Sequence, residues 1–186
     1  MSLSTKNNSG GRDRIKKRSE RIRDIAVFAM LGTVMFCSKI IMEALPNIHL
    51  LGMLTMSYTL VFRVKALIPI YVYVFLNGLF AGFDVWWIPY LYIWTILWGI
   101  TMLLPKKTPR VVSIIVYPLI CALHGLMFGA LYAPVQAILF DFTLEETLLW
   151  IAAGIPFDII HCFGNIFVGI LILPFSELLR KLYNKR

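Results

Sequence analysis

The chain has 186 residues, of which 59% are hydrophobic and 15% are charged. Soluble domains contain roughly 45–50% apolar and about 25% charged residues, so this composition excludes an ordinary soluble domain. The net charge of +8 is explained without nucleic acid, because each basic residue near a membrane gains about 1 kcal/mol from anionic lipid. We therefore expect a membrane protein that contacts lipid and binds no nucleic acid.

Six apolar stretches follow one another along the chain, and each predicts a transmembrane helix. They are Ile25–Leu45, Leu50–Phe62, Ala66–Phe83, Trp86–Leu104, Val111–Phe140 and Leu148–Phe175. Crossing a hydrocarbon core of about 30 Å takes about 20 residues, so the second stretch is the weakest candidate. Only helices and closed barrels satisfy their backbone in lipid. The predicted fold class is an all-α integral membrane protein with six transmembrane helices.

The basic residues predict the orientation of these helices. Seventeen of the 18 Lys and Arg residues lie before the first stretch, between the second and third, between the fourth and fifth, or after the last. The other connections carry only acidic charges: Glu43, Asp84, Asp141, Glu145 and Glu146. Because Lys- and Arg-rich short loops stay cytoplasmic, both termini are predicted inside the cell. We expect a basic cytoplasmic tail (1–24), a single transmembrane domain (25–176) and a second basic cytoplasmic tail (177–186).

Ionisable side chains inside a membrane are candidates for function, because burying them is costly. Lys39 and Glu43 lie one turn apart near the outer end of the first predicted helix. They either neutralise each other as an ion pair or contact a ligand. The same helix carries small residues that permit close approach of another helix, within the bundle or from a partner subunit. These residues are Ala26, Ala29, Gly32 and Thr33.

The third and fourth helices contribute polar and aromatic candidates. Tyr73 and Asn77 share one face of the third helix, and Asp84 follows its end. On the fourth helix Trp87, Tyr90 and Trp94 form one aromatic stripe. Such a wall can stack a flat ligand, and the alternatives are core packing or an interfacial belt. Asn77 serves either helix–helix bonding or ligand recognition.

The last predicted helix carries a polar stripe. Asp158, His161 and Asn165 fall on one face, opposite an apolar face suited to lipid. The stripe is therefore expected inside the bundle, as a structural network or as ligand-binding machinery. Asp158 and His161 are spaced for a hydrogen bond that would fix the imidazole tautomer. His49, in the connection after the first helix, is a further candidate to cap the site.

Several catalytic patterns are absent from the sequence. The chain lacks a phosphate-binding G-x-x-x-x-G-K-[ST] loop and the H-E-x-x-H and G-x-S-x-G motifs, so ATP hydrolysis, if needed, is assigned to other subunits. The three cysteines predict no disulfide framework or zinc site. We expect no metal, no bound cofactor and no catalytic residue. Two alternatives are an assembly factor and a lipid-processing enzyme. The enzyme would use a metal or acid–base site made of Asp158, His161, His124 and Glu43.

Taken together, five segments of the chain resemble one family. They are Ile25–Leu31, Leu45–Ile48, Leu79–Phe83, Trp86–Trp94, and Pro156–Asp158 with His161 and Asn165. In these segments the chain resembles the substrate-binding S components of energy-coupling factor (ECF) transporters, the vitamin importers of bacteria and archaea. The resemblance covers residues 22 to 183. Within the family the chain is most similar to the cobalamin-binding type.

The resemblance implies a six-helix S-component fold in a bacterial cell membrane. It implies a vitamin bound in the outer half, a transmembrane coupling subunit as partner, and two cytoplasmic ATPase subunits that use ATP and Mg. Members of the family carry Ala-x-x-x-Ala where they meet the coupling subunit, whereas this chain has Ala29 and Thr33. Cobalamin is the expected ligand, with His49 as a possible cobalt ligand. Riboflavin, thiamine and a queuosine precursor remain alternatives.

Overall fold

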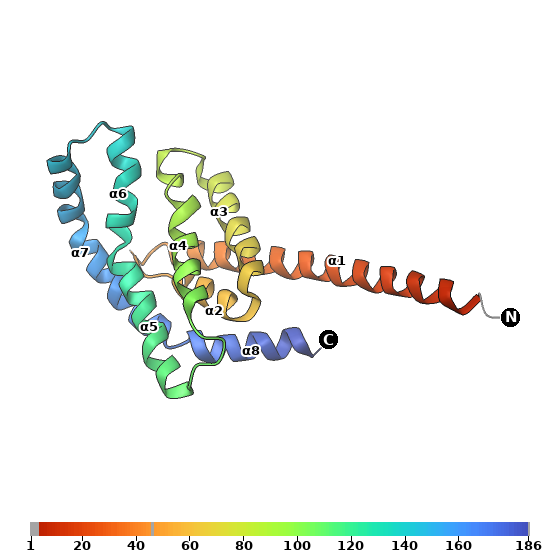
Figure 1. Cartoon of the computed structure of the whole chain (residues 1–186). Coiled ribbons are helices and arrows are strands. Elements are labelled where there is room, and N and C mark those ends of the chain that lie inside the picture. Colours follow the sequence, from red (N-terminus) through yellow and green to blue (C-terminus); the bar gives the residue numbers. More distant parts are fainter. Residues whose placement is uncertain (1–3, 46, 186) are drawn as a thin grey trace.

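The computed structural model describes residues 4–45 and 47–185 (Figure 1). Every regular element in these residues is a helix. The α-helices are α1 (Ser4–Ile41), α2 (Leu51–Phe62), α3 (Leu67–Ala81), α4 (Tyr90–Leu103), α5 (Arg110–Leu126), α6 (Phe128–Leu139), α7 (Leu144–Gly169) and α8 (Ile172–Asn184). Two short 3₁₀ helices, η1 (Arg63–Ala66) and η2 (Val85–Trp87), precede α3 and α4.

Five helical segments are long and apolar enough to cross a membrane. The prediction of an all-α chain is confirmed for the described residues, and these segments agree with a membrane protein. They are Gly11–Ile41, Leu51–Ala81, Val85–Leu103, Arg110–Leu139 and Leu144–Gly169. Six separate spans are not confirmed. The second and third predicted stretches fall in one 31-residue helical segment, because η1 follows α2 and precedes α3 without a gap. Helix α2 has 12 residues and α3 has 15. Each is shorter than the length of about 20 residues that a span needs.

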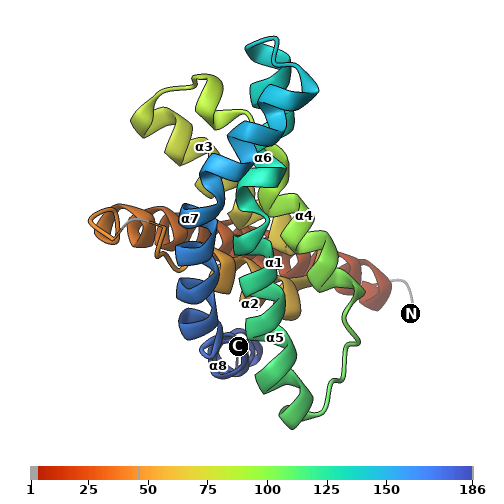
Figure 2. The same ribbon diagram turned by 90° about the vertical axis from the view of Figure 1, so that its left-hand side faces the viewer.

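Acidic and basic residues lie in connections at different ends of the molecule. Figures 1 and 2 show the α3–α4 and α6–α7 connections at one end, and the α4–α5 connection and α8 at the other. The first two connections contain Asp84 and Asp141, and the α4–α5 connection contains Lys106 and Lys107. In both views α1 runs across α4 to α7 rather than along them. The connections with Asp84 and Asp141 therefore lie apart from the connection with Lys106 and Lys107, and the orientation of the whole chain stays a prediction.

Helix α2 forms the centre of the core. Residues 51–59 are all buried, which follows from the position of this short helix among α1, α4, α5, α7 and α8. The chain then turns sharply at Arg63, whose φ is 54°. The Arg63 guanidinium donates to the Met102 carbonyl at 2.7 Å, and Trp98 Nε1 donates to the Arg63 carbonyl at 3.1 Å. These two bonds fasten the turn between α2 and α3 to α4.

Close helix contacts depend on small residues, as is usual in membrane proteins. A Cβ atom built on Gly169 would lie 2.7 Å from Pro118 Cα, where α7 meets α5. A Cβ atom on Gly125 would lie 2.6 Å from Asn165 Nδ2 at the same interface. Helix α7 can approach α5 this closely only because these positions carry no side chain.

A polar network joins three elements at the end of the molecule that carries α8. Asp24 of α1 accepts from Lys65 Nζ of η1 at 2.8 Å and from the Tyr183 hydroxyl of α8 at 2.6 Å. The guanidinium of Arg23 lies 4.9 Å from the centre of the Tyr183 ring. Because the Lys65 side chain is 59% exposed, this ion pair contributes at most about 1 kcal/mol. The ion pair joins α1 to η1, and the hydrogen bond from Tyr183 joins α1 to α8.

The α5–α7 contact gives a testable prediction. We expect Gly169→Ala to lower the free energy of unfolding by about 1–3 kcal/mol, because the new methyl group displaces the Pro118 backbone. Gly154→Ala is a matched control in the same helix, since nothing lies within 4 Å of its added Cβ. Gly154→Ala should leave stability unchanged or raise it through helix propensity. Thermal unfolding in detergent measures both variants, and equal midpoints would contradict the proposed contact.

Candidate ligand-binding site

Six rings from separate elements gather around the buried side chain of Trp94. Their residues and Trp94 are called here the Trp94 cluster: Trp94, His49, Tyr73, Tyr90, His124, Phe128 and His161. Five of these rings have centroids between 5.7 and 6.1 Å from that of Trp94. His161 completes the cluster through His49, at 4.7 Å, and Phe128, at 5.1 Å. The α1–α2 connection and helices α3, α4, α5, α6 and α7 thus converge on one place.

Unpaired polar atoms are concentrated in this cluster. Among the described residues, nine buried side-chain nitrogen or oxygen atoms have no hydrogen-bond partner in the protein. Seven belong to the cluster or to Asn77, which lies one turn beyond Tyr73 on α3: His49 Nδ1, Tyr73 OH, both amide atoms of Asn77, Trp94 Nε1, His124 Nδ1 and His161 Nε2. Each unpaired buried group costs about 1–3 kcal/mol. Such a concentration indicates a site whose partners come from outside the chain.

These atoms offer both donors and acceptors. His124 Nε2 donates to the Ile93 carbonyl at 3.1 Å, which leaves Nδ1 as an acceptor. Trp94 Nε1 is a donor, and the Asn77 amide provides one donor group and one acceptor. His49 lies in the connection between α1 and α2, where burial lowers its pKa to about 4. The ring is therefore neutral at pH 7, so this part of the site suits an uncharged portion of a ligand.

A cavity of about 190 Å³ adjoins the cluster. Its lining residues come from the end of α1, the α1–α2 connection and the cluster: Lys39, Met42, Glu43, Leu45, Asn47, Ile48, His49, Tyr90, Phe128 and His161. Lys39 Nζ lies 3.9 Å from Glu43 Oε1, and the Glu43 side chain is 64% exposed. The two charges thus form the predicted ion pair at the rim of the cavity. The volume is below the range of about 300–1,000 Å³ usual for drug-sized ligands.

Two predicted residues, Asp84 and Trp87, stabilise the α3–α4 connection. Asp84 accepts from the Val85 amide at 2.6 Å and caps η2. Trp87 Nε1 donates to the Val74 carbonyl at 2.8 Å. The polar groups of both residues are therefore engaged within the α3–α4 region, and neither residue lines the cavity. Tyr90, which was predicted on the same stripe, does line it.

The polar stripe of α7 divides into structural residues and one site residue. Both carboxylate oxygens of Asp158 accept from the Gly129 amide at 3.1 Å, and Asn165 Nδ2 donates to the Cys121 carbonyl at 2.9 Å. The predicted Asp158–His161 bond is not formed. The reason is that Gly129 lies in the first turn of α6, where amides lack helical partners, and the carboxylate supplies one. His161 alone reaches the cavity.

The small residues predicted to meet a partner lie on two faces of α1. A Cβ on Gly32 would lie 2.5 Å from Val72 Cγ1, so Gly32 serves internal packing against α3. Ala26, Ala29 and Thr33 are exposed. The Thr33 hydroxyl donates to the Ala29 carbonyl at 2.9 Å, which satisfies it without a partner. An exposed stripe of small residues therefore remains on the outside of α1.

Phe128 was not among the predicted site residues, and His124 was considered only for an enzyme. Both were difficult to place because residues 111–140 form one apolar run in the sequence. In the structure this run bends at Met127, between α5 and α6. The four-residue spacing of His124 and Phe128 is the signal that points to a shared face. Their rings lie 6.3 Å apart.

Within the described ranges, no group of three His, Cys, Asp or Glu side chains is placed to hold a metal ion. No family model, curated protein or solved structure matches the chain.

The contact between Asp158 and Gly129 gives a second prediction. Asp158→Ala leaves the Gly129 amide buried without a partner, so we expect a loss of about 1–3 kcal/mol in the free energy of unfolding. Asp158→Asn keeps an acceptor oxygen and should retain most of the stability. Chemical or thermal unfolding of the two purified variants measures the difference. Equal losses would mean that the negative charge, rather than the hydrogen bond to α6, is what matters.

Proposed function

We propose that this chain is the substrate-binding S component of an ECF-type vitamin importer, most like the cobalamin-binding type. The observation that carries this proposal is the set of seven unpaired polar atoms in the Trp94 cluster and Asn77. Two of the residues that carry them, His49 and His161, line the adjoining cavity. In the proposed arrangement the chain crosses a bacterial cell membrane six times, with both termini in the cytoplasm. The separation of acidic from basic connections (Figure 1) supports this orientation.

The chemistry of the Trp94 cluster favours a flat, largely uncharged ligand. Aromatic walls provide stacking surface, and the free donors and acceptors can recognise amides, hydroxyls or ring nitrogens. Cobalamin carries peripheral amides of this kind, and His49 is placed where it can reach a bound ligand. A corrin ring is larger than the 190 Å³ cavity, so cobalamin requires the chain around residues 42–45 and 47–49 to move aside. Riboflavin, thiamine or a queuosine precursor requires a smaller movement.

Transport requires an energy source outside this chain. In the proposal, a transmembrane coupling subunit and two cytoplasmic ATPase subunits supply it, with ATP and Mg bound by the ATPases. The exposed face of α1 formed by Ala26, Ala29 and Thr33 supports docking of the coupling subunit, because small residues allow helices to approach closely. The substitution of Thr33 for the second alanine of the family pattern is tolerated at such a contact, since its hydroxyl is already bonded within the helix.

A lipid-processing enzyme is less well supported. Its site required Asp158, His161, His124 and Glu43 to act together. Asp158 bonds to the backbone of α6, and Glu43 pairs with Lys39 at the rim. Ligand binding accounts for the unpaired nitrogen atoms of His124 and His161. A purely structural assembly factor would leave these two atoms without partners.

The proposal is tested by ligand binding to the purified full chain. After incubation with cobalamin and removal of free ligand, a visible spectrum with the corrin absorption at one equivalent per chain supports cobalamin. Riboflavin fluorescence quenching and thermal shifts with thiamine or the queuosine precursor test the alternatives in parallel. Failure to bind any of these ligands would overturn the S-component proposal. A protein that shows no corrin absorption but binds another ligand of the panel overturns only the choice of cobalamin.

Unpaired polar atoms give a more specific prediction. Tyr73→Phe removes a hydroxyl that has no partner, so the empty protein should be as stable as before or more stable. The affinity for the ligand found above should fall about 2- to 10-fold, the equivalent of one hydrogen bond.

Tyr58→Phe is the matched control for this experiment. Tyr58 is equally buried, but its hydroxyl donates to the Leu31 carbonyl at 3.2 Å. This variant should lower the unfolding midpoint and leave the affinity of the folded protein unchanged. If both variants behave alike, the Tyr73 hydroxyl does not face the ligand.

A further inference from the structure

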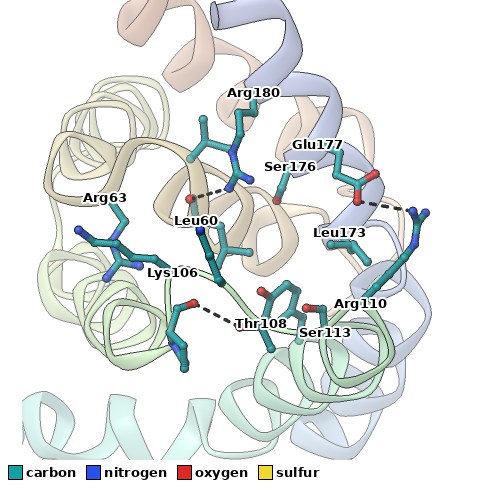
Figure 3. A pocket seen from close by; sticks show the side chains of 14 residues that line it. Leu60, Arg63, Lys106, Thr108, Arg110, Ser113, Leu173, Ser176, Glu177 and Arg180 are labelled. Atoms are coloured by element: carbon teal, nitrogen blue, oxygen red, sulfur yellow. Dashed lines mark hydrogen bonds and ion pairs between the residues drawn. The ribbon is translucent and has the colours of Figure 1, made fainter.

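A second and larger cavity has a volume of about 510 Å³, and Figure 3 shows the side chains that line it. The α4–α5 connection and α8, which contribute to its lining, lie at the opposite end of the molecule from the α3–α4 and α6–α7 connections (Figure 1). It is bounded by the end of α2, the α4–α5 connection, the start of α5, and α8. Its charged lining residues are Arg63, Lys106, Lys107, Arg110, Arg180 and Glu177. Five cations and one carboxylate leave a net charge of +4 in this basic cavity.

The structure holds the guanidinium groups in place without neutralising most of their charge. Arg63 donates to the Met102 carbonyl at 2.7 Å, and Arg180 donates to the Leu60 carbonyl at 3.3 Å. Only Arg110 meets a carboxylate, that of Glu177, at 3.9 Å (Figure 3). A carbonyl oxygen orients a cation but does not cancel its charge. The cavity therefore concentrates positive charge that an anion can compensate.

The two lysines of the α4–α5 connection have fewer polar interactions than the arginines that line the cavity. Within the described part of the chain, no hydrogen bond or ion pair to the amine of Lys106 or Lys107 is found. Helix α5 begins beside them, and its N-cap residue, Pro109, provides no side-chain cap. The positive end of this helix adds to the field of the five cations.

Exposed apolar side chains flank the cationic α4–α5 connection in sequence. Leu103, at the end of α4, is 85% exposed, and Val111, in the first turn of α5, is 72% exposed. Neither residue lines the cavity, but Leu103 is three residues from Lys106 and Val111 follows Arg110 directly, so the cations and exposed apolar side chains are close along the chain. This combination is the chemistry of a phospholipid, in which a phosphate is joined to acyl chains.

We propose that the basic cavity binds the phosphate of an anionic membrane phospholipid, whose acyl chains lie along Leu103 and Val111. A lipid is favoured over an acidic protein partner for two reasons. The charges line a concave space of the size of a headgroup, and the flanking residues are apolar. This inference does not depend on the identity of the vitamin or on the Trp94 cluster.

The experiment measures binding of short-chain lipids to the purified full chain in a neutral detergent. Dioctanoyl phosphatidylglycerol, dioctanoyl phosphatidylcholine and inorganic phosphate are each titrated, and the thermal unfolding midpoint gives an apparent dissociation constant. We expect phosphatidylglycerol to bind at least about tenfold more tightly than phosphatidylcholine. The difference in affinity between the two lipids should become smaller at high salt, because the cavity is open to solvent.

A matched pair of double variants locates the site. Lys106→Gln with Lys107→Gln should weaken phosphatidylglycerol binding about tenfold or more, as expected from about 1 kcal/mol for each lysine. Lys16→Gln with Lys17→Gln removes the same charge from an exposed part of α1 and should leave binding unchanged. Midpoints without lipid show whether each variant is folded.

Three outcomes would overturn the proposal. Equal weakening by the two double variants indicates a diffuse attraction to net charge. Inorganic phosphate that binds as tightly as phosphatidylglycerol indicates a site for the free anion, not for a lipid. The third outcome combines two results: phosphatidylglycerol and phosphatidylcholine bind equally, and the Lys106 and Lys107 double variant no longer binds membrane partner subunits. Together these results indicate a protein-docking surface.

Discussion

The arrangement of this protein depends on one constraint, namely that polar groups inside an apolar bundle need partners. Asp158 supplies a partner for the first turn of α6, and Asn165 supplies one for the Cys121 carbonyl of α5. Tyr58 does the same for Leu31 of α1. Each of these bonds joins two different helices, through residues that are 27 to 44 positions apart in the chain. The helix packing is therefore specified by a small number of satisfied polar side chains, set among apolar contacts that are less directional.

Against this background the two sites of the molecule differ in chemistry. Around Trp94 the unpaired polar atoms belong to uncharged side chains and are buried, and the Lys39–Glu43 ion pair lies at the rim of the adjoining cavity. At the other end, five cations surround an open cavity with one carboxylate. A neutral, enclosed site selects a ligand by shape and hydrogen bonding, whereas a charged, solvated site selects by charge and is weakened by salt. Two ligands of different chemistry can therefore occupy the molecule without competing.

Much of the fold class and part of the site could be predicted from the sequence. The 3.6-residue period placed Tyr73 with Asn77 on the third helix and Tyr90 with Trp94 on the fourth. The rings of Tyr73 and Tyr90 each lie 6.1 Å from that of Trp94. The helical period could not predict three features: the partner of Asp158, the turn at Arg63 and the bend at Met127. A spacing of three residues permits an Asp158–His161 bond, but the competing Gly129 amide is 29 positions away. The turn at Arg63 lies between two apolar stretches, and the bend at Met127 lies within one. At neither place does the hydropathy of the sequence indicate a change of direction.

The same constraint limits which solutes the Trp94 cluster can accept. Six side chains with unpaired atoms, at about 1–3 kcal/mol each, would cost as much as the whole stability of a typical domain, about 5–15 kcal/mol. They therefore require water or a ligand. The adjoining cavity of 190 Å³ has room for several waters, and two of the six side chains, His49 and His161, line it. A ligand that displaces this water gains affinity only if it reproduces the lost hydrogen bonds. A solute of similar size that lacks the matching groups leaves buried atoms unpaired, so discrimination comes mainly from the positions of atoms such as His49 Nδ1 and His161 Nε2.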